Sequence, residues 1–184
     1  MVATKLTTAE ELLAMPDDGY RYELIEGVLQ RMPGAGEEHS EVWAELLWYM
    51  KTFVRERDLG AVVGGDAGFI FGRDPDIVRI PDIAFTRKER LRPRDQRVGF
   101  SPIVPDLVVE VVSPSNRPDQ LADKIVFYLA AGVRLVLEID PDPRTVTVHA
   151  PGIAPRVLGE GDILDGGDVL PGFTVPVAAI FDLP

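Results

Sequence analysis

The chain has 184 residues, of which 19 are lysine or arginine and 30 are aspartate or glutamate, so its formal net charge at pH 7 is −11. A folded chain of this length hides about 70% of the surface that its unfolded form exposes, and a hydrophobic share of 46% is enough to fill one core. We therefore expect a single domain over residues 1–184, and we exclude a collagen, a coiled coil and a disordered tail. The sequence has no cysteine, which excludes a disulfide framework, a thiolate zinc site and a cysteine nucleophile. Any metal must bind through oxygen or histidine.

The start of the chain and the length of its apolar runs indicate a location. Residues 1–15 are acidic and helix-like, whereas a secretion signal is basic and then apolar. No run approaches the about 18 to 20 apolar residues that span a bilayer. We expect a cytoplasmic protein without membrane contact.

The basic residues are concentrated in one segment. A net charge of −11 opposes non-specific binding of nucleic acid unless basic groups are gathered locally. Residues 87–97 hold six basic and two acidic residues. The basic ones are Arg87, Lys88, Arg90, Arg92, Arg94 and Arg97. From charge alone, a solvated loop is the simpler interpretation.

The first third of the chain predicts a helix, a hairpin and a long helix. A capping-box pattern at residues 7–11 begins a short helix, which residues 16–19 end. Residues 20–32 contain two β-type runs around a Glu-Gly pair, which is typical of a hairpin. From residue 39 or 40 to about residue 58, apolar residues recur every three or four positions, as on one face of a helix.

Strands and one more helix follow. Three apolar runs bounded by Gly, Pro or Asp predict three strands, at 61–63 with 69–71, at 77–85 and at 107–112. Apolar spacing then predicts a second helix from Pro118 to Gly132. Further β-type segments lie at 133–139, at 145–149 and in a Gly-rich tail from residue 151. This alternation, without repeats or linkers, predicts one α/β domain.

Two carboxylates interrupt strands that otherwise read as buried. Asp82 follows Pro81 at the start of an apolar run, and Glu110 lies among valines on its own face of a strand. A buried carboxylate is costly unless it gains a cation or loses its charge. Taken alone, Asp82 is also consistent with a turn residue and Glu110 with a salt bridge to the next helix. Lys124 lies on the apolar stripe of that helix, so we expect it to point at the sheet and meet Glu110.

Two carboxylates on neighbouring strands beside a lysine have a chemical use. Carboxylate oxygens suit Mg²⁺ or Mn²⁺, which keep coordination positions open for water and phosphate. Such an ion acidifies a bound water, while an ammonium group neutralises developing negative charge. The set formed by Asp82, Glu110 and Lys124 therefore predicts phosphodiester hydrolysis.

Several short motifs together resemble the Uma2 family (DUF820) of restriction endonuclease-like proteins. They are Tyr-Glu-Leu-Ile-Glu-Gly at 22–27, Glu-His-Ser at 38–40, Pro-Asp-Ile-Ala-Phe at 81–85, Pro-Asp-Leu-Val-Val-Glu-Val-Val-Ser-Pro-Ser at 105–115, Lys124, Tyr128, Ala-Gly-Val at 131–133 and Val-Leu-Pro-Gly-Phe at 169–173. Each motif alone is weak, and their combination is specific. The resemblance implies the PD-(D/E)XK nuclease superfamily, with a restriction endonuclease-like α/β fold: a central mixed β-sheet flanked by helices. To that core this chain adds an N-terminal hairpin and a C-terminal β tail.

The resemblance also implies roles for particular residues. Asp82 matches the aspartate of the PD element and Glu110 the acidic residue of the (D/E)XK element, both as ligands of Mg²⁺ or Mn²⁺. The in-strand lysine is replaced by Val112, so Lys124 would have to supply it. Glu23 either completes the metal site or is a hydrogen-bonded strand residue. His39 orients water, contacts phosphate, or lies at a helix start.

Other residues carry less specific expectations. His149 lies in an alternating strand and is expected to be structural, and Tyr128 is interpreted first as core and second as a hydroxyl that reaches the site. Trp48, at the edge of the apolar stripe of the long helix, is a candidate interface residue. The resemblance further implies a homodimer. Because residues 87–97 leave the strand that follows Asp82, they either contact the phosphates of a nucleic acid or form a solvated loop.

The sequence thus predicts a metal-dependent endonuclease acting on nucleic acid, with DNA as the expected substrate. A non-catalytic protein of the same fold, which binds metal or a partner, is the alternative that the net charge favours. A small-molecule phosphohydrolase would share the metal site without needing the basic segment.

Overall fold

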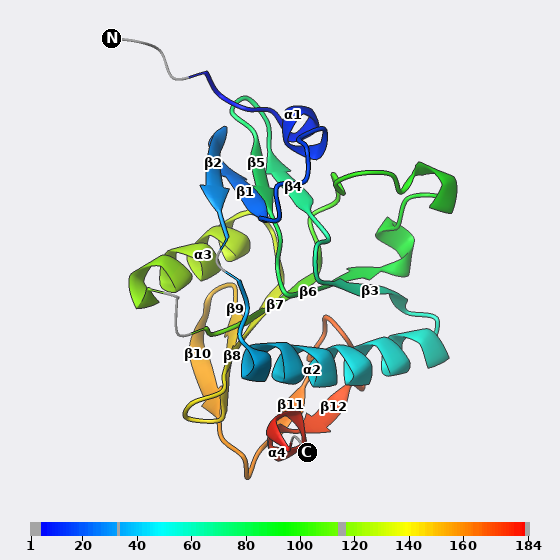
Figure 1. Cartoon of the computed structure of the whole chain (residues 1–184). Coiled ribbons are helices and arrows are strands. Elements are labelled where there is room, and N and C mark those ends of the chain that lie inside the picture. Colours follow the sequence, from blue (N-terminus) through cyan, green and yellow to red (C-terminus); the bar gives the residue numbers. More distant parts are fainter. Residues whose placement is uncertain (1–4, 33, 114–116, 183–184) are drawn as a thin grey trace.

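The computed structural model describes residues 5–32, 34–113 and 117–182 (Figure 1). Its helices are α1 (Ala9–Leu13), α2 (Glu37–Glu56), α3 (Pro118–Ala130) and α4 (Val177–Phe181), with short 3-10 helices η1 (Lys88–Arg90) and η2 (Arg94–Gln96). Its strands are β1 (Tyr22–Ile25), β2 (Val28–Arg31), β3 (Gly60–Gly64), β4 (Phe69–Gly72), β5 (Ile77–Arg79), β6 (Ile83–Arg87), β7 (Leu107–Val111), β8 (Leu135–Asp140), β9 (Thr145–Ala150), β10 (Ile153–Leu158), β11 (Ile163–Asp165) and β12 (Thr174–Pro176). None of the helices in this part of the chain is both long and apolar enough to cross a membrane.

The main sheet is mixed, as predicted. Its six strands have the order β10-β9-β8-β7-β6-β3. Strands β7 and β8 run parallel, with Glu110 opposite Glu138, and the other neighbours are antiparallel. A parallel pair needs a crossover, and α3 provides it between β7 and β8. The described residues therefore confirm a mixed α/β fold with helices against the sheet.

Helices cover both faces of this sheet. Alternation along β7 sends Leu107, Val109 and Val111 into the cluster that contains the apolar stripe of α2. The intervening Val108 packs instead with the apolar residues of α3. Figure 1 shows α2 lying across the sheet and α3 beside β7, above β8 and β9. Glu110 is two positions after Val108, so its side chain points to the same face of β7, toward α3.

A second sheet stands beside the first one. Its strand order is β2-β1-β5-β4, and the β1–β2 hairpin turns through Glu26 and Gly27, both at positive φ. The predicted hairpin is therefore confirmed, as is the capping box between Thr8 and Glu11. Strand β5 pairs with β1 through Val78 and Leu24, which brings Arg79 beside Glu23.

The segment 77–85, predicted as one strand, is two strands in different sheets. Strand β5 ends at Arg79 in the small sheet, and β6 begins at Ile83 in the large one. Proline has no backbone N–H and ends a ladder easily, so Pro81 allows the chain to pass between the sheets. Asp82 consequently lies at the junction.

Two other expectations are also wrong in detail. The runs 61–63 and 69–71, predicted as one strand, are β3 in the large sheet and β4 in the small one, separated by a turn in which Gly65 has φ +76°. The tail contains not only strands but also α4. Five residues are too few to display a helical period. The last residues of the Ser-Pro-Ser motif, 114 and 115, lie outside the described residues.

Candidate active site

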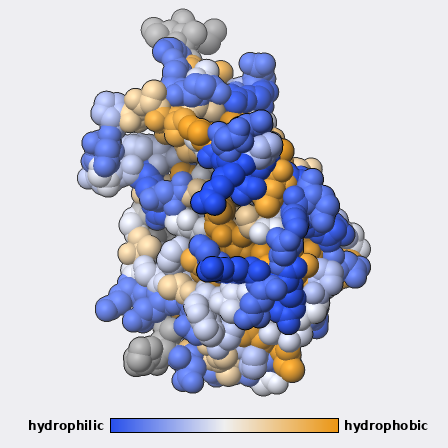
Figure 2. All heavy atoms as spheres, turned by 90° about the vertical axis from the view of Figure 1, so that its right-hand side faces the viewer, coloured by the Kyte–Doolittle hydropathy of each residue, from blue (hydrophilic) through white to orange (hydrophobic). Residues whose placement is uncertain are grey.

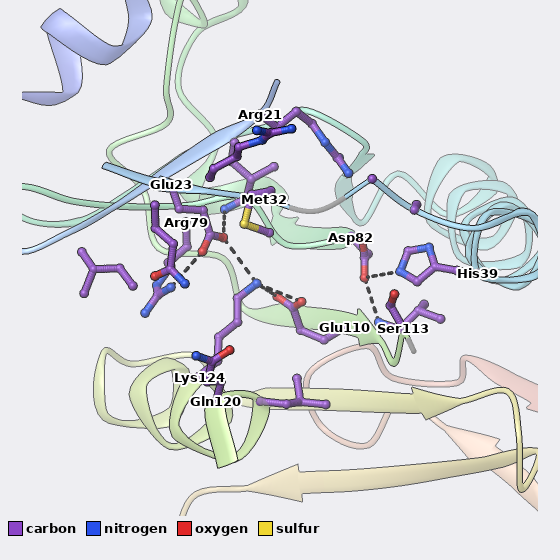
Figure 3. Close-up of a pocket in the computed structure, with 18 of the residues that line it drawn as sticks. Arg21, Glu23, Met32, His39, Arg79, Asp82, Glu110, Ser113, Gln120 and Lys124 are labelled. Atoms are coloured by element: carbon purple, nitrogen blue, oxygen red, sulfur yellow. Dashed lines mark hydrogen bonds and ion pairs between the residues drawn. The ribbon is translucent and has the colours of Figure 1, made fainter. Parts of the chain in front are cut away.

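One cavity of about 400 Å³ collects all five residues proposed for catalysis from the sequence. Figure 3 shows Glu23, His39, Asp82, Glu110 and Lys124 pointing toward one another. They come from β1, α2, the position just before β6, β7 and α3, respectively. The cavity therefore forms where both sheets and both long helices meet.

Lys124 joins two of the carboxylates. Its Nζ lies 2.9 Å from Oε1 of Glu110 and 3.3 Å from Oε1 of Glu23. Burial alone lowers the pKa of Lys124, but the charges of Glu110 and Glu23 outweigh it and raise the pKa above its ordinary value. Lys124 therefore points at the sheet and meets Glu110, as the apolar-stripe argument predicted, and its raised pKa favours the charged form.

Glu110 lies at the floor of the cavity and is 7% exposed. The Tyr128 hydroxyl donates a hydrogen bond of 2.7 Å to its Oε1 atom, so this buried tyrosine belongs to both the core and the site. Burial raises the pKa of Glu110 to about 7, and the charges of Asp82 and Glu23 add to that rise against the attraction of Lys124. A further cation in the cavity would stabilise the ionised form of this carboxyl group.

Both carboxylate oxygens of Glu23 have partners. Its Oε1 accepts a 2.8 Å hydrogen bond from the Ile80 backbone N–H, and its Oε2 accepts one of 2.8 Å from Arg79. Burial raises the pKa of Glu23, but Lys124 and Arg79 outweigh it and hold the pKa below its ordinary value. Because the same oxygen that faces Ile80 also faces Lys124, Glu23 is placed to hold the lysine.

Several contacts hold Asp82 in place, among them a hydrogen bond of 3.3 Å from the Gly65 N–H to its backbone carbonyl. Its Oδ2 accepts a 2.8 Å hydrogen bond from the N–H of Val111 and lies 3.4 Å from Nε2 of His39. Its backbone carbonyl accepts a hydrogen bond from the indole of Trp43. The antiparallel register, in which Ile83 faces Val109, brings Asp82 level with Glu110 on the next strand.

His39 lies behind Asp82. The hydrogen bond with Asp82 raises the pKa of His39, although burial opposes the rise. Its Nδ1 is buried and has no hydrogen-bond partner among the described residues. His39 therefore orients Asp82 and retains one ring nitrogen for a further contact.

The donor set fits a small, hard cation. Carboxylate oxygens are the ligands that Mg²⁺ and Mn²⁺ prefer, and Mg²⁺ keeps several waters beside one or two carboxylates. In the described part of the chain, no three His, Asp or Glu side chains come close enough to hold one ion together. Asp82 and Glu110 are the carboxylates that would hold such an ion, with water completing its coordination. The raised pKa of Glu110 indicates that Lys124 alone does not offset its burial, so a further cation would be favoured there.

The six basic residues of segment 87–97 lie elsewhere. None of them lines this cavity, because they leave β6 at the end opposite to Asp82. Arg87 donates to the carbonyl of Val169 at 3.3 Å, Lys88 pairs with Asp58, and Arg90 pairs with Asp106 at 2.7 Å. Their contact with nucleic acid stays a prediction.

Two arginines that sequence reasoning did not single out line the cavity instead. Arg79 holds Glu23, and Arg21 lies on the same wall, paired with Asp66 at 3.3 Å. In the sequence, charged residues at every second position of a strand indicate a face exposed to solvent. No local signal therefore distinguished these two arginines from exposed ones. Among the other expectations, His149 pairs with Glu138 at 2.9 Å, and Trp48 is 58% exposed.

Comparison with known proteins agrees with this fold. No curated protein matches the chain. A solved structure described as a "putative nuclease belonging to DUF820" from Anabaena variabilis ATCC 29413 is similar, with a TM-score of 0.82 and 22% identity over 95% of this chain and 97% of that one. The Uma2 family, described as "Putative restriction endonuclease", matches residues 9–178. The structural likeness supports the fold, and the description of the family supports a nuclease. The match over most of the sequence shows that the chain belongs to the Uma2 family.

Proposed function

We propose that the protein is a metal-dependent endonuclease that hydrolyses phosphodiester bonds, with DNA as its substrate. One observation carries the proposal: a buried lysine cation lies between two carboxylates, and a third carboxylate stands level with one of them. The descriptions of the family and of the structural neighbour support the same class of activity.

Asp82 and Glu110 would hold the ion, which is Mg²⁺ or Mn²⁺. When bound, such an ion supplies an acidified water and screens the phosphate charge. The ammonium of Lys124 neutralises negative charge that develops on the attacked phosphate. Glu23 and Arg79 keep that ammonium in place, and His39 keeps Asp82 oriented.

The position of the basic segment bears on the size of the substrate. Residues 87–97 begin at the far end of β6 and none of them lines the cavity of Lys124, so a substrate that touches both must extend well beyond the phosphate at Lys124. A small-molecule phosphohydrolase would need no such second contact. Replacing Arg90, Arg92 and Arg94 together should therefore lower DNA affinity and flatten its dependence on salt if the substrate is nucleic acid.

Cleavage tests the proposal directly. Supercoiled plasmid, single-stranded DNA and RNA are each incubated with Mg²⁺, Mn²⁺ or EDTA, and the wild type is compared with Glu110→Gln and Lys124→Ala. We expect metal-dependent cleavage of DNA that both substitutions abolish.

Glu138→Gln is the matched control. Glu138 occupies the equivalent register position on β8 but pairs with His149 outside the cavity, so this variant should cleave like the wild type. Cleavage that survives Glu110→Gln would identify a contaminant. An absence of cleavage on every substrate would favour the non-catalytic alternative, in which Lys124 serves to neutralise Glu110.

A further inference from the structure

A second cavity, of about 360 Å³, opens on another part of the surface. It lies between α1, strands β3 and β4, and the segment 88–103, which projects on the right of Figure 1. Figure 2 views that side and shows hydrophobic surface framed by hydrophilic side chains. Leu13, Val63, Phe69 and Phe100 contribute apolar walls. The size falls within the range of small-molecule sites in proteins.

Arginines stand at the edge of this apolar cavity. Arg90 is anchored by the buried carboxylate of Asp106, 2.7 Å away. The Nε of Arg97 donates a 2.7 Å hydrogen bond to the backbone carbonyl of Arg92, which ties these two residues together. Both Arg92 and Arg97 line the cavity. The cavity therefore combines an apolar interior with fixed positive charge.

Arg92 has no carboxylate of its own. Its side chain is half-buried, yet within residues 5–32, 34–113 and 117–182 no acidic group forms an ion pair with it. The chain has 30 acidic residues for 19 basic ones, yet the carboxylates nearest to this cavity have other partners: Asp66 pairs with Arg21 and Asp106 with Arg90. A partly buried cation without a counter-ion gains most from an anion that arrives from outside.

The cavity is separate from the candidate active site but adjoins it. None of Asp82, Glu110 and Lys124 lines it. Asp66 lies on its wall and pairs at 3.3 Å with Arg21, which lines the other cavity. The ion pair between Asp66 and Arg21 therefore connects the wall of the second cavity to the wall of the candidate active site.

We propose that this cavity binds a small amphipathic anion, with its apolar body against Phe69 and Phe100 and its acidic group on Arg92 and Arg97. The proposal does not depend on nuclease activity. Apolar walls alone would take any hydrophobic molecule, whereas the unpaired guanidinium of Arg92 selects one that carries a negative charge.

Two probes of nearly the same shape test the proposal. Anilinonaphthalene sulfonate carries a negative charge, and N-phenylnaphthylamine is its uncharged counterpart; both become fluorescent in apolar surroundings. We expect the native protein to bind one sulfonate probe per chain. Arg92→Gln and Arg97→Gln should each weaken that binding about tenfold or more, while binding of the uncharged probe stays the same.

Arg156→Gln supplies the control, because it removes the same charge from β10, where Arg156 pairs with Asp165. It should leave both probes unaffected. Equal loss of both probes in Arg92→Gln, or no loss of the sulfonate in either cavity variant, would overturn the proposal.

Competition identifies the source of the anion. Displacement of the probe by a nucleoside monophosphate would indicate a nucleotide, and displacement by octanoate would indicate a fatty acid. Two results would contradict a small-molecule site. One is displacement by duplex DNA but by neither small anion, which would assign these arginines to nucleic acid. The other is loss of probe binding as light scattering reports a doubled mass, which would mean that a second copy covers the cavity.

Discussion

Nζ of Lys124 lies 2.9 Å from Oε1 of Glu110 although the two residues are 14 positions apart, one on α3 and the other on β7. Helix α3 turns its apolar stripe to the sheet, and Lys124 occupies a place on that stripe beside the buried Leu121 and Ile125. The ammonium thus reaches the site from the helix. The strand itself supplies no lysine, because Val112 occupies the position two residues after Glu110.

Removal of this cation should be costly. Lys124→Met leaves Glu110 and Glu23 buried beside each other with less compensating charge, and breaking one side of a buried pair typically costs about 3–5 kcal/mol. We expect a loss of that order in the free energy of unfolding at pH 8, measured by urea denaturation in EDTA. Lys88→Met breaks an exposed pair with Asp58 and should cost no more than about 1 kcal/mol. Similar losses in both variants would mean that the buried pair contributes no more to the free energy of unfolding than an exposed pair does.

Sequence patterns predicted the parts of the site that depend on a single element. A lysine on an apolar helical stripe and a glutamate inside a valine-rich strand are both anomalies within a local period. Each of them required a partner, and the structure pairs them with each other. The order of elements likewise predicted an α/β fold, and the resemblance to the Uma2 family implied the mixed sheet flanked by helices that the structure has.

The parts that were missed depend on how the two sheets meet. Residues 77–85 read as one strand-like run in the sequence. Pro81 marks a place where a strand can end, but nothing local shows that the two halves belong to different sheets. The pairing of β5 with β1 in the small sheet brings Arg79 to Glu23, and Arg21, next to β1, lies on the cavity wall. Long-range packing decides these contacts, so no residue spacing reveals them.

The pKa of Glu110 predicts a pH dependence. Its ordinary value of 4.5 rises to about 7 on folding because of burial, so the folded state holds this proton more tightly than the unfolded state does. The associated stabilisation is complete below pH 4.5 and is lost as the pH rises through 7. Lys124, Tyr128, Asp82 and Glu23 are the polar or charged groups that face it.

Glu110→Gln should remove this dependence. Relative to the wild type, the free energy of unfolding of the variant should increase between pH 5 and pH 8, by at most about 3 kcal/mol. Urea denaturation in EDTA at both pH values measures the difference. Glu138→Gln, on the neighbouring strand, should show no comparable change. A difference between Glu110→Gln and wild type that is the same at both pH values would contradict the assignment.

Divalent ions should stabilise the wild type through Asp82 and Glu110. At ten times its dissociation constant, an ion that binds only the folded state adds about 1.4 kcal/mol, or about 4 °C in Tm for a chain of this size. Asp82→Asn or Glu110→Gln should abolish the shift, which differential scanning fluorimetry with Mg²⁺, Mn²⁺ and Ca²⁺ measures. Glu138→Gln should retain it. An undiminished shift in both site variants would place the ion elsewhere.

Glu23 should act through Lys124. Glu23→Gln can keep an oxygen toward the Ile80 N–H, but it removes a charge that raises the pKa of Lys124. Cleavage should therefore slow by about tenfold in kcat, as is usual when a residue that orients a reacting group is lost, with KM unchanged. Glu10→Gln, which breaks the exposed pair with Arg73, should leave kcat unaltered.

A measurement without substrate separates positioning from mere structural support. In metal-free protein, the rate at which an amine reagent modifies Lys124 depends on the fraction of uncharged amine, so its midpoint pH reports the pKa of that lysine. In Glu23→Gln the midpoint should move to lower pH, because one of the two carboxylates that hold the proton has become neutral. An unchanged midpoint together with a lower kcat would show that Glu23 stabilises the structure of β1 at the cavity and does not hold the proton on Lys124.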